Sequence, residues 1–91
     1  MDGFVVTDFK NNAIRVVGVD GSTATLAGSQ KGKPGYADGV GATARFYGPA
    51  GIAAHPDGGF VVCDCNNHRL RHVTLDGVVS VAHAANHPEH I

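Results

Sequence analysis

The sequence predicts an all-β fold of short antiparallel strands, and three observations support this prediction. Glycine accounts for 13 of the 91 residues and charged residues for only 16%, whereas about 25% charged residues are usual in a soluble domain. Valine-rich runs are separated by Asp-Gly and Pro-Asp-Gly turn signals. A stretch near the start of the chain also recurs near its end, which indicates a repeat architecture.

The repeat aligns without a gap. Residues 3–21, GFVVTDFKNNAIRVVGVDG, match residues 59–77, GFVVCDCNNHRLRHVTLDG, at an offset of 56 positions. The first-copy residues that find an identical partner are Gly3, Phe4, Val5, Val6, Asp8, Asn11, Arg15, Val17, Asp20 and Gly21. Agreement at this level indicates two copies of one structural unit.

Each copy predicts the same succession of strands. β-rich runs follow a glycine, then a second run ends at an Asp-Gly turn, and a third run comes after it. These runs are Phe4–Asp8, Ile14–Val19 and Thr23–Ala27 in the first copy, and Phe60–Asp64, Leu70–Leu75 and Val78–Ala82 in the second. Gly51–His55 adds an inner strand before the second copy and is closed by Pro56-Asp57-Gly58. Four strands in a meander form one blade of a β-propeller.

The chain therefore divides into four parts. Residues 1–28 form a partial blade of three strands, whose innermost strand is expected to be missing because Met1 directly precedes the second. Residues 29–48 form a glycine-rich linker between blades, with a helical turn expected over Ala42–Tyr47. Residues 49–82 form a full blade of four strands, and residues 83–91 form a tail that is expected to be disordered. The predicted fold is an incomplete propeller ring.

Two Asp and two Asn residues are predicted to have structural roles in turns. Asp8 and Asp64 end equivalent strands, where a short carboxylate can accept hydrogen bonds from free turn N–H groups. Asn11 and Asn67 are expected to adopt the positive φ that such turns need. Each copy carries the same pair, whereas a catalyst would need only one.

Two further stretches resemble a known family. Residues 65–77 contain Asn67-His68-Arg69-Leu70-Arg71, which resembles the N-H-R-I-R signature of the NHL repeat. The preceding residues resemble the long form of that repeat, D-G-x-G-x-x-A-x-F-x-x-P-x-G-I-A, through Asp38, Gly39, Gly41, Ala44, Phe46, Pro49, Gly51, Ile52 and Ala53. The first copy departs from the signature at Asn11-Asn12-Ala13, and His55 stands where the family usually has Asp. The resemblance implies an NHL-type β-propeller, of which this chain supplies about one and a half to two blades.

This resemblance implies a non-enzymatic binding or scaffold module that presents a loop surface for protein–protein interaction. An RNA-binding propeller piece is one alternative, but the formal net charge of −1 and the six aromatic residues give it little support. Part of a metal-dependent propeller lyase or hydrolase is another, and His55 is the histidine roughly placed for it. Phosphate-loop, G-x-S-x-G and H-E-x-x-H motifs are absent from the sequence. We therefore expect no enzyme activity and no cofactor.

Candidate binding and metal-ligating residues are weak. The possible binding residues are Arg15, His68, Arg69 and Arg71, and the arginines are expected to point alternately outward from the second strand of each blade. Packing between blades, or hydrogen bonding to a neighbouring carbonyl, is the plainer use for them. Zinc-ligand spacing is imitated by Cys63, Cys65, His68 and His72. The repeat places Cys63 and Cys65 at ordinary strand positions and His72 opposite Val16, and the resemblance makes His68 the signature His of a turn. His83, His87 and His90 lie in the tail, so no metal site is predicted.

Fewer than two blades leave apolar faces and strand edges uncovered. We therefore expect protein partners or further propeller blades, supplied by a longer chain or by a homo-oligomer that completes a ring. No membrane or nucleic-acid partner is expected. The sequence shows no signal peptide and no apolar run of membrane-spanning length, so a soluble, cytoplasmic protein is the default expectation.

Overall fold

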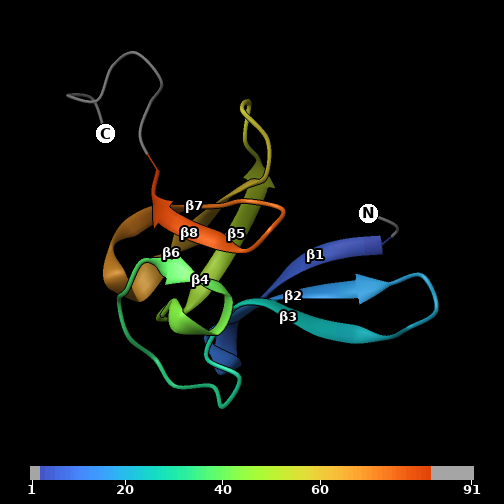
Figure 1. The fold of residues 1–91 in the computed structure, drawn as a ribbon. Helices are drawn as coiled ribbons and strands as arrows, with labels where there is room; N and C mark the ends of the chain where they lie inside the picture. The colour runs from blue at the N-terminus through green and yellow to red at the C-terminus, as the bar shows by residue number, and fades with distance from the viewer. Residues whose placement is uncertain (1–2, 83–91) are drawn as a thin grey trace.

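The computed structural model describes residues 3–82, so the predicted disordered tail and its three histidines lie outside the described residues. Within this range the chain is all-β, as predicted, with antiparallel strands in two separate sheets and three short 3₁₀ helices (Figure 1). No helix among these residues is long and apolar enough to cross a membrane.

The first sheet has three strands in the order β1-β2-β3. Its strands are β1 (Gly3–Asp8), β2 (Ala13–Gly18) and β3 (Thr23–Gly28), and a 3₁₀ helix, η1 (Phe9–Asn11), joins the first two. Between β2 and β3, Gly21 takes φ 87° and Asp20 accepts a hydrogen bond from the Ser22 N–H at 3.0 Å. The predicted Asp-Gly turn therefore forms the hairpin.

The second sheet contains the predicted four-stranded meander and one strand more. Its strands are β5 (Pro49–Ala54), β6 (Phe60–Asp64), β7 (Arg69–Val73) and β8 (Val78–Val81), with η3 (Cys65–Asn67) between β6 and β7. The additional strand, β4 (Gly39–Val40), comes from the linker and pairs with β8, so the order is β4-β8-β7-β6-β5. A strand of only two residues is too short to show the alternation of apolar and polar side chains that identifies a strand in a sequence. The sequence therefore did not predict β4.

The glycine directly before β6 shows why one residue is shared by the two copies. Gly59 adopts φ 72°, and a Cβ there would lie 2.4 Å from the Val73 carbonyl oxygen. Gly3, its counterpart and the first residue of β1, has φ 145°, and a Cβ there would likewise clash with the Val17 carbonyl oxygen. Only glycine permits both this backbone conformation and this close approach.

The linker has less helix than predicted. The 3₁₀ helix η2 covers Gly41–Thr43, and Ala44 is already extended, with φ −71° and ψ 156°. The prediction of a helical turn over Ala42–Tyr47 is therefore wrong for most of its length. The physical reason is burial: Ala44 and Phe46 are fully buried while the residues between and after them are not, and an extended backbone produces that alternation.

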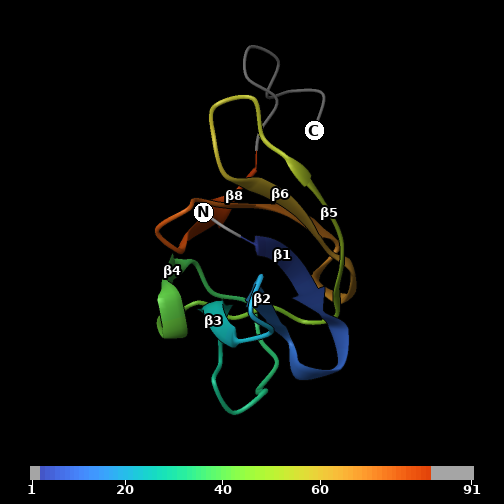
Figure 2. The same cartoon turned by 90° about the vertical axis from the view of Figure 1, so that its right-hand side faces the viewer.

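One apolar core joins the two sheets and the linker. Its buried members are Ile14 and Ala27 from the first sheet, Ala44 and Phe46 from the linker, and Val62, Val73 and Val79 from the second sheet. Figure 2 shows the sheets as two layers, with β1 beside the layer that contains β5 and β6. The Thr7 hydroxyl also donates a hydrogen bond to the Ala50 carbonyl, which ties β1 to β5. Face-to-face packing of two strand meanders is the arrangement of neighbouring propeller blades.

Candidate functional site

The first sheet has one face turned away from the second sheet, and we call it the open face. The open face consists of Phe4, Val6, Asp8, Arg15, Val17 and Thr25. Its repeat counterpart is a face of the second sheet formed by Phe60, Val62, Asp64, Arg71 and Val73, which we call the buried face. The buried face is turned toward the first sheet, since Val62 and Val73 share the core with Ile14 and Ala27. Every member of the buried face is identical to its open-face counterpart.

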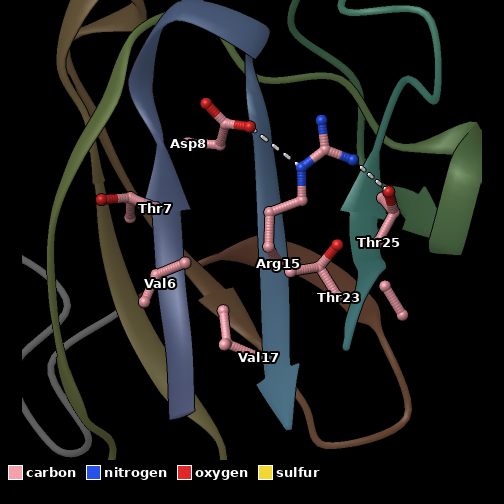
Figure 3. A pocket seen from close by; sticks show the side chains of 8 residues that line it. Val6, Thr7, Asp8, Arg15, Val17, Thr23 and Thr25 are labelled. Atoms are coloured by element: carbon pink, nitrogen blue, oxygen red, sulfur yellow. Dashed lines mark hydrogen bonds and ion pairs between the residues drawn. The ribbon is translucent and has the colours of Figure 1, made fainter. Parts of the chain in front are cut away.

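The open face is apolar at one end and polar at the other. Phe4 is 68% exposed and Val6 is 38% exposed, whereas Val62 is fully buried at the position equivalent to Val6. A hollow of about 590 Å³ lies over this face, and Figure 3 shows Asp8 and Arg15 at its polar end. Large exposed apolar side chains grouped on one sheet face are typical of a surface that another protein covers.

Asp8 and Arg15 form an ion pair at the polar end of the open face. The Arg15 Nε lies 3.0 Å from Asp8 Oδ2, and the Arg15 Nη1 donates to the Thr25 hydroxyl (Figure 3). Asn11 donates its amide to both Asp8 oxygens at 3.1 and 3.0 Å. Partial burial raises the pKa of Asp8, but the hydrogen bonds from Asn11 and Arg15 and the guanidinium charge lower it further, so the pKa lies below its usual value. Asp8 is therefore a carboxylate at neutral pH.

The equivalent pair on the buried face is fully enclosed. The Arg71 Nη1 lies 2.7 Å from Asp64 Oδ2, and both side chains are 0% exposed, against 23% for Arg15 and 29% for Asp8. Asn67 donates to Asp64 Oδ2 at 2.8 Å, and the Tyr47 N–H donates to Asp64 Oδ1 at 2.8 Å. A buried ion pair of this kind needs further hydrogen bonds to offset its desolvation.

Those further hydrogen bonds come from residues 35–47, which we call the capping loop. It supplies three backbone carbonyls and one carboxylate as hydrogen-bond acceptors for Arg71 and Asn67. Arg71 donates to the carbonyls of Arg45 and Ala37 at 3.0 and 2.9 Å and to Asp38 Oδ1 at 3.0 Å. Asn67 donates to the Gly35 carbonyl at 2.8 Å.

The capping loop also places two aromatic rings beside the Arg71 guanidinium. The ring centres of Tyr36 and Phe46 lie 4.8 and 5.0 Å from the guanidinium carbon. The guanidinium is thus held by acceptors at its edge and by aromatic rings at its faces.

These positions correct part of the prediction for the arginines. Arg71 does not point outward: its side chain is fully buried, and its guanidinium donates hydrogen bonds to the capping loop. Hydrogen bonding to neighbouring carbonyls, the plainer of the two expectations, accounts for it. Arg15 is half-buried on the open face, and Arg69 is exposed, with its guanidinium carbon 5.7 Å from the ring centre of Tyr36.

The turn residues also differ from the prediction. Asn11 and Asn67 do not adopt positive φ; the adjacent residues Asn12 and His68 do, each at 55°. The reason is that Asn11 and Asn67 end the 3₁₀ helices and donate their side chains to the Asp residues, so the left-handed residue comes one position later. The Asp residues therefore bind these amide side chains, and Asp8 also has a backbone hydrogen bond with Asn11 of its own turn.

Asn12 is a positioning residue that the sequence analysis missed. Its Oδ1 accepts the Gly48 N–H at 2.9 Å, and its Nδ2 donates to the Gly32 carbonyl at 3.0 Å, so it ties the first sheet to both ends of the linker. Asparagine is among the few residues that tolerate the left-handed region. The repeat alignment places Asn12 opposite His68 of the NHL signature, and this equivalence is the signal in the sequence that could have identified Asn12.

The four residues with zinc-like spacing do not gather in one place. Cys63 and Cys65 have their Sγ atoms 3.3 Å apart and line a hollow of about 620 Å³ together with His68. His72 lies elsewhere: its ring stacks on that of His55 at 4.0 Å, and its Nε2 is 2.9 Å from the Gly58 carbonyl oxygen. Within residues 3–82 no group of three or more potential metal-ligating His, Cys, Asp or Glu side chains occurs.

The two thiols support a prediction about reactivity. The hydrogen bond with Cys65, then burial, then the charges of Cys65 and Asp64 raise the pKa of Cys63 above its usual value. Because the thiolate is the reactive form, alkylation of Cys63 by iodoacetamide at pH 8 is expected to be faster in a Cys65→Ala variant than in the wild type. Mass spectrometry of the alkylated peptide over a pH series measures this, with Cys65→Ser as a control that keeps a hydrogen-bonding group. An unchanged pH profile in Cys65→Ala would contradict the assignment.

The fold and the paired faces define a class of structure: two consecutive blades of an incomplete β-propeller, the first with three strands and the second with the full meander. Residues 46–73 match the family model of the NHL repeat, which confirms the resemblance predicted from the sequence. No curated protein matches the chain in sequence.

Several solved structures share this fold, two from Bacteroides species among them. An auxiliary nutrient binding protein from Bacteroides ovatus ATCC 8483 aligns with 91% of the chain at a TM-score of 0.71 and 23% identity. A protein of the same description from Bacteroides thetaiotaomicron VPI-5482 aligns with 88% of the chain at a TM-score of 0.72 and 22% identity. The aligned part covers 23% and 22% of those two proteins, so the chain spans less than a quarter of their length.

Proposed function

We propose that the chain is a non-enzymatic binding module whose open face is covered by another blade of the same kind. One observation carries this proposal: apart from Thr25, every residue of the open face is repeated in the face that the second sheet buries against a neighbouring blade. The same set of side chains is thus present on both sheets, but within residues 3–82 only the set on the second sheet is covered by a neighbouring blade. The contact surface is a sheet face, and not only the loops that the family resemblance implied.

The second sheet offers the complementary surface. The side chains of the first sheet that face the second sheet lie at Val5, Thr7, Ile14 and Val16. Their repeat counterparts on the far side of the second sheet are Val61, Cys63, Leu70 and His72. A second copy of the chain can therefore place this far side on the open face in a head-to-tail contact, the kind that forms rings or open arrays. Two of these four pairs change residue character, which favours a specific neighbour over unlimited self-stacking.

The structural neighbours support a binding role. Both are described as auxiliary nutrient binding proteins, and this chain corresponds to less than a quarter of each. A binding surface assembled from several blades would need the contacts between blades that the open face provides. The nutrient of those proteins is not carried over to this chain, because the shared feature is the fold.

Sedimentation equilibrium of the purified chain tests the proposal. The average mass is expected to rise with concentration above the 9.4 kDa of the single chain. Val6→Glu is expected to weaken this association at least tenfold. The counterpart Val62 is fully buried, so a carboxylate at position 6 would have to be desolvated when another blade covers the open face. Val19→Glu is the matched control, since Val19 is 80% exposed and lies beside the hairpin turn. A cooperatively folded monomer of 9.4 kDa at every concentration would overturn the proposal.

A further inference from the structure

We propose that the polar end of the open face is a binding site for a glycine-rich loop supplied by the partner. The ligand is a loop with an acidic side chain, an aromatic ring and free backbone carbonyls, of the same chemistry as the capping loop. This inference rests on the proposed function, since it specifies what part of the partner contacts Asp8 and Arg15.

The first argument is the state of the Arg15 guanidinium. Arg15 uses Nε for Asp8 and Nη1 for Thr25, and no hydrogen bond to its Nη2 is formed within residues 3–82 (Figure 3). Arg71, the identical residue of the second copy, uses Nη2 for two acceptors of the capping loop, the Ala37 carbonyl and Asp38. The open face thus presents a charged donor whose counterpart binds a carbonyl and a carboxylate.

The second argument is how the side-chain amides of the equivalent residues Asn67 and Asn11 distribute their hydrogen bonds. Asn67 divides its amide between Asp64 and the Gly35 carbonyl of the capping loop. Asn11 has the same position but directs its amide to the two oxygens of Asp8. A docked loop carbonyl would let Asn11 adopt the divided arrangement. It would also let a loop N–H bind the Asp8 oxygen so released, as the Tyr47 N–H binds Asp64.

The third argument is the space above the pair. The capping loop places Tyr36 and Phe46 within about 5 Å of the Arg71 guanidinium carbon. Over Arg15 the same region is a hollow of about 590 Å³, bordered by Val6, Val17 and Thr25. Aromatic rings that enter this hollow would contact apolar side chains and the guanidinium face together. An acidic and aromatic loop therefore fits the charge, the donors and the shape of the site.

The test is an NMR titration of the ¹⁵N-labelled full chain with a synthetic peptide that has the sequence of residues 34–48, PGYADGVGATARFYG. Saturable shift changes are expected at Asp8, Arg15 and Thr25. Arg15→Ala is expected to weaken binding about tenfold or more, since charge-assisted hydrogen bonds are lost. Arg15→Lys keeps the charge but loses the planar guanidinium, so its affinity for the peptide is expected to lie between those of the wild type and Arg15→Ala. Spectra of the free variants establish that both still fold.

The peptide itself offers a matched control. A peptide with the residues equivalent to Tyr36 and Phe46 replaced by alanine is expected to produce little or no shift, because the guanidinium face and the apolar rim lose their contact. Shifts confined to Asp64 and Arg71 would mean that the peptide displaces the chain's own capping loop, and would overturn the proposal. Binding that is unaffected by Arg15→Ala would also overturn it.

The outcomes also separate this proposal from the proposed function. Self-association of the chain without peptide binding would overturn the loop site and leave the docking of a blade intact. Peptide binding to a chain that stays monomeric at every concentration would support the loop site and overturn the docking of a second copy. Failure of both measurements would overturn both.

Discussion

Replacing Asp64 by alanine is expected to destabilise the fold by about 3–5 kcal/mol. Asp64 and Arg71 are both 0% exposed and their side chains are 2.7 Å apart, so the substitution removes the buried counter-ion of the guanidinium and leaves it only the exposed carboxylate of Asp38. The Tyr47 N–H and the Asn67 amide lose an acceptor at the same time. Because small domains are stable by only about 5–15 kcal/mol, the midpoint of urea unfolding, followed by circular dichroism, should shift strongly.

The repeat provides a matched control for this substitution. Asp8→Ala removes the same carboxylate from the same place in the first copy, where the partner Arg15 keeps access to water. The expected loss is about 0–1 kcal/mol, as for other exposed ion pairs. Equal losses in Asp64→Ala and Asp8→Ala would show that enclosure by the capping loop does not determine the energetics of the pair.

Replacing Phe46 by alanine is expected to destabilise the fold by about 3–5 kcal/mol. Phe46 is fully buried in the core that joins the linker to both sheets, and its ring also lies 5.0 Å from the Arg71 guanidinium carbon. The substitution therefore creates a cavity between the sheets and removes a contact with a buried cation. The free energy of unfolding from urea titration measures the effect.

Phe4→Ala is the corresponding control on the open face. Phe4 is 68% exposed, so its removal is expected to change the stability of the isolated chain by no more than about 0.5 kcal/mol. If another blade covers the open face at higher protein concentration, the loss should grow with concentration. A loss as large as that of Phe46→Ala in dilute solution would contradict the assignment of Phe4 to an uncovered face.

The strands could be predicted because their signals are local. Valine-rich runs such as Phe60–Asp64, a preceding glycine and an Asp-Gly turn each act within a few residues, and the repeat doubles every signal. The left-handed residue was misplaced by one position for a related reason. Asn11 and Asn12 both tolerate turns, and only the hydrogen bond from Asn11 to Asp8 shows which of them donates its side chain and which adopts positive φ.

The linker could not be predicted in the same way. The short strand β4 exists because its two residues pair with β8, which lies almost forty positions further along the chain. The extended backbone around Phe46 likewise results from burial between two sheets and not from local preference. Such contacts outweigh weak local propensity, so they are visible only when the chain is folded.

By itself the sequence determined the all-β class, the two copies and the identical Asp, Asn and Arg in each, since these follow from local periodicity and from comparison of the chain with itself. Only the tertiary structure decided that one Asp–Arg pair is enclosed and the other is open to solvent. The physical reason is that the same side chains at the same register have the same local geometry, whereas their desolvation depends on what lies above the sheet. In the second copy that is the capping loop and the neighbouring blade, and neither is encoded in the residues of the pair.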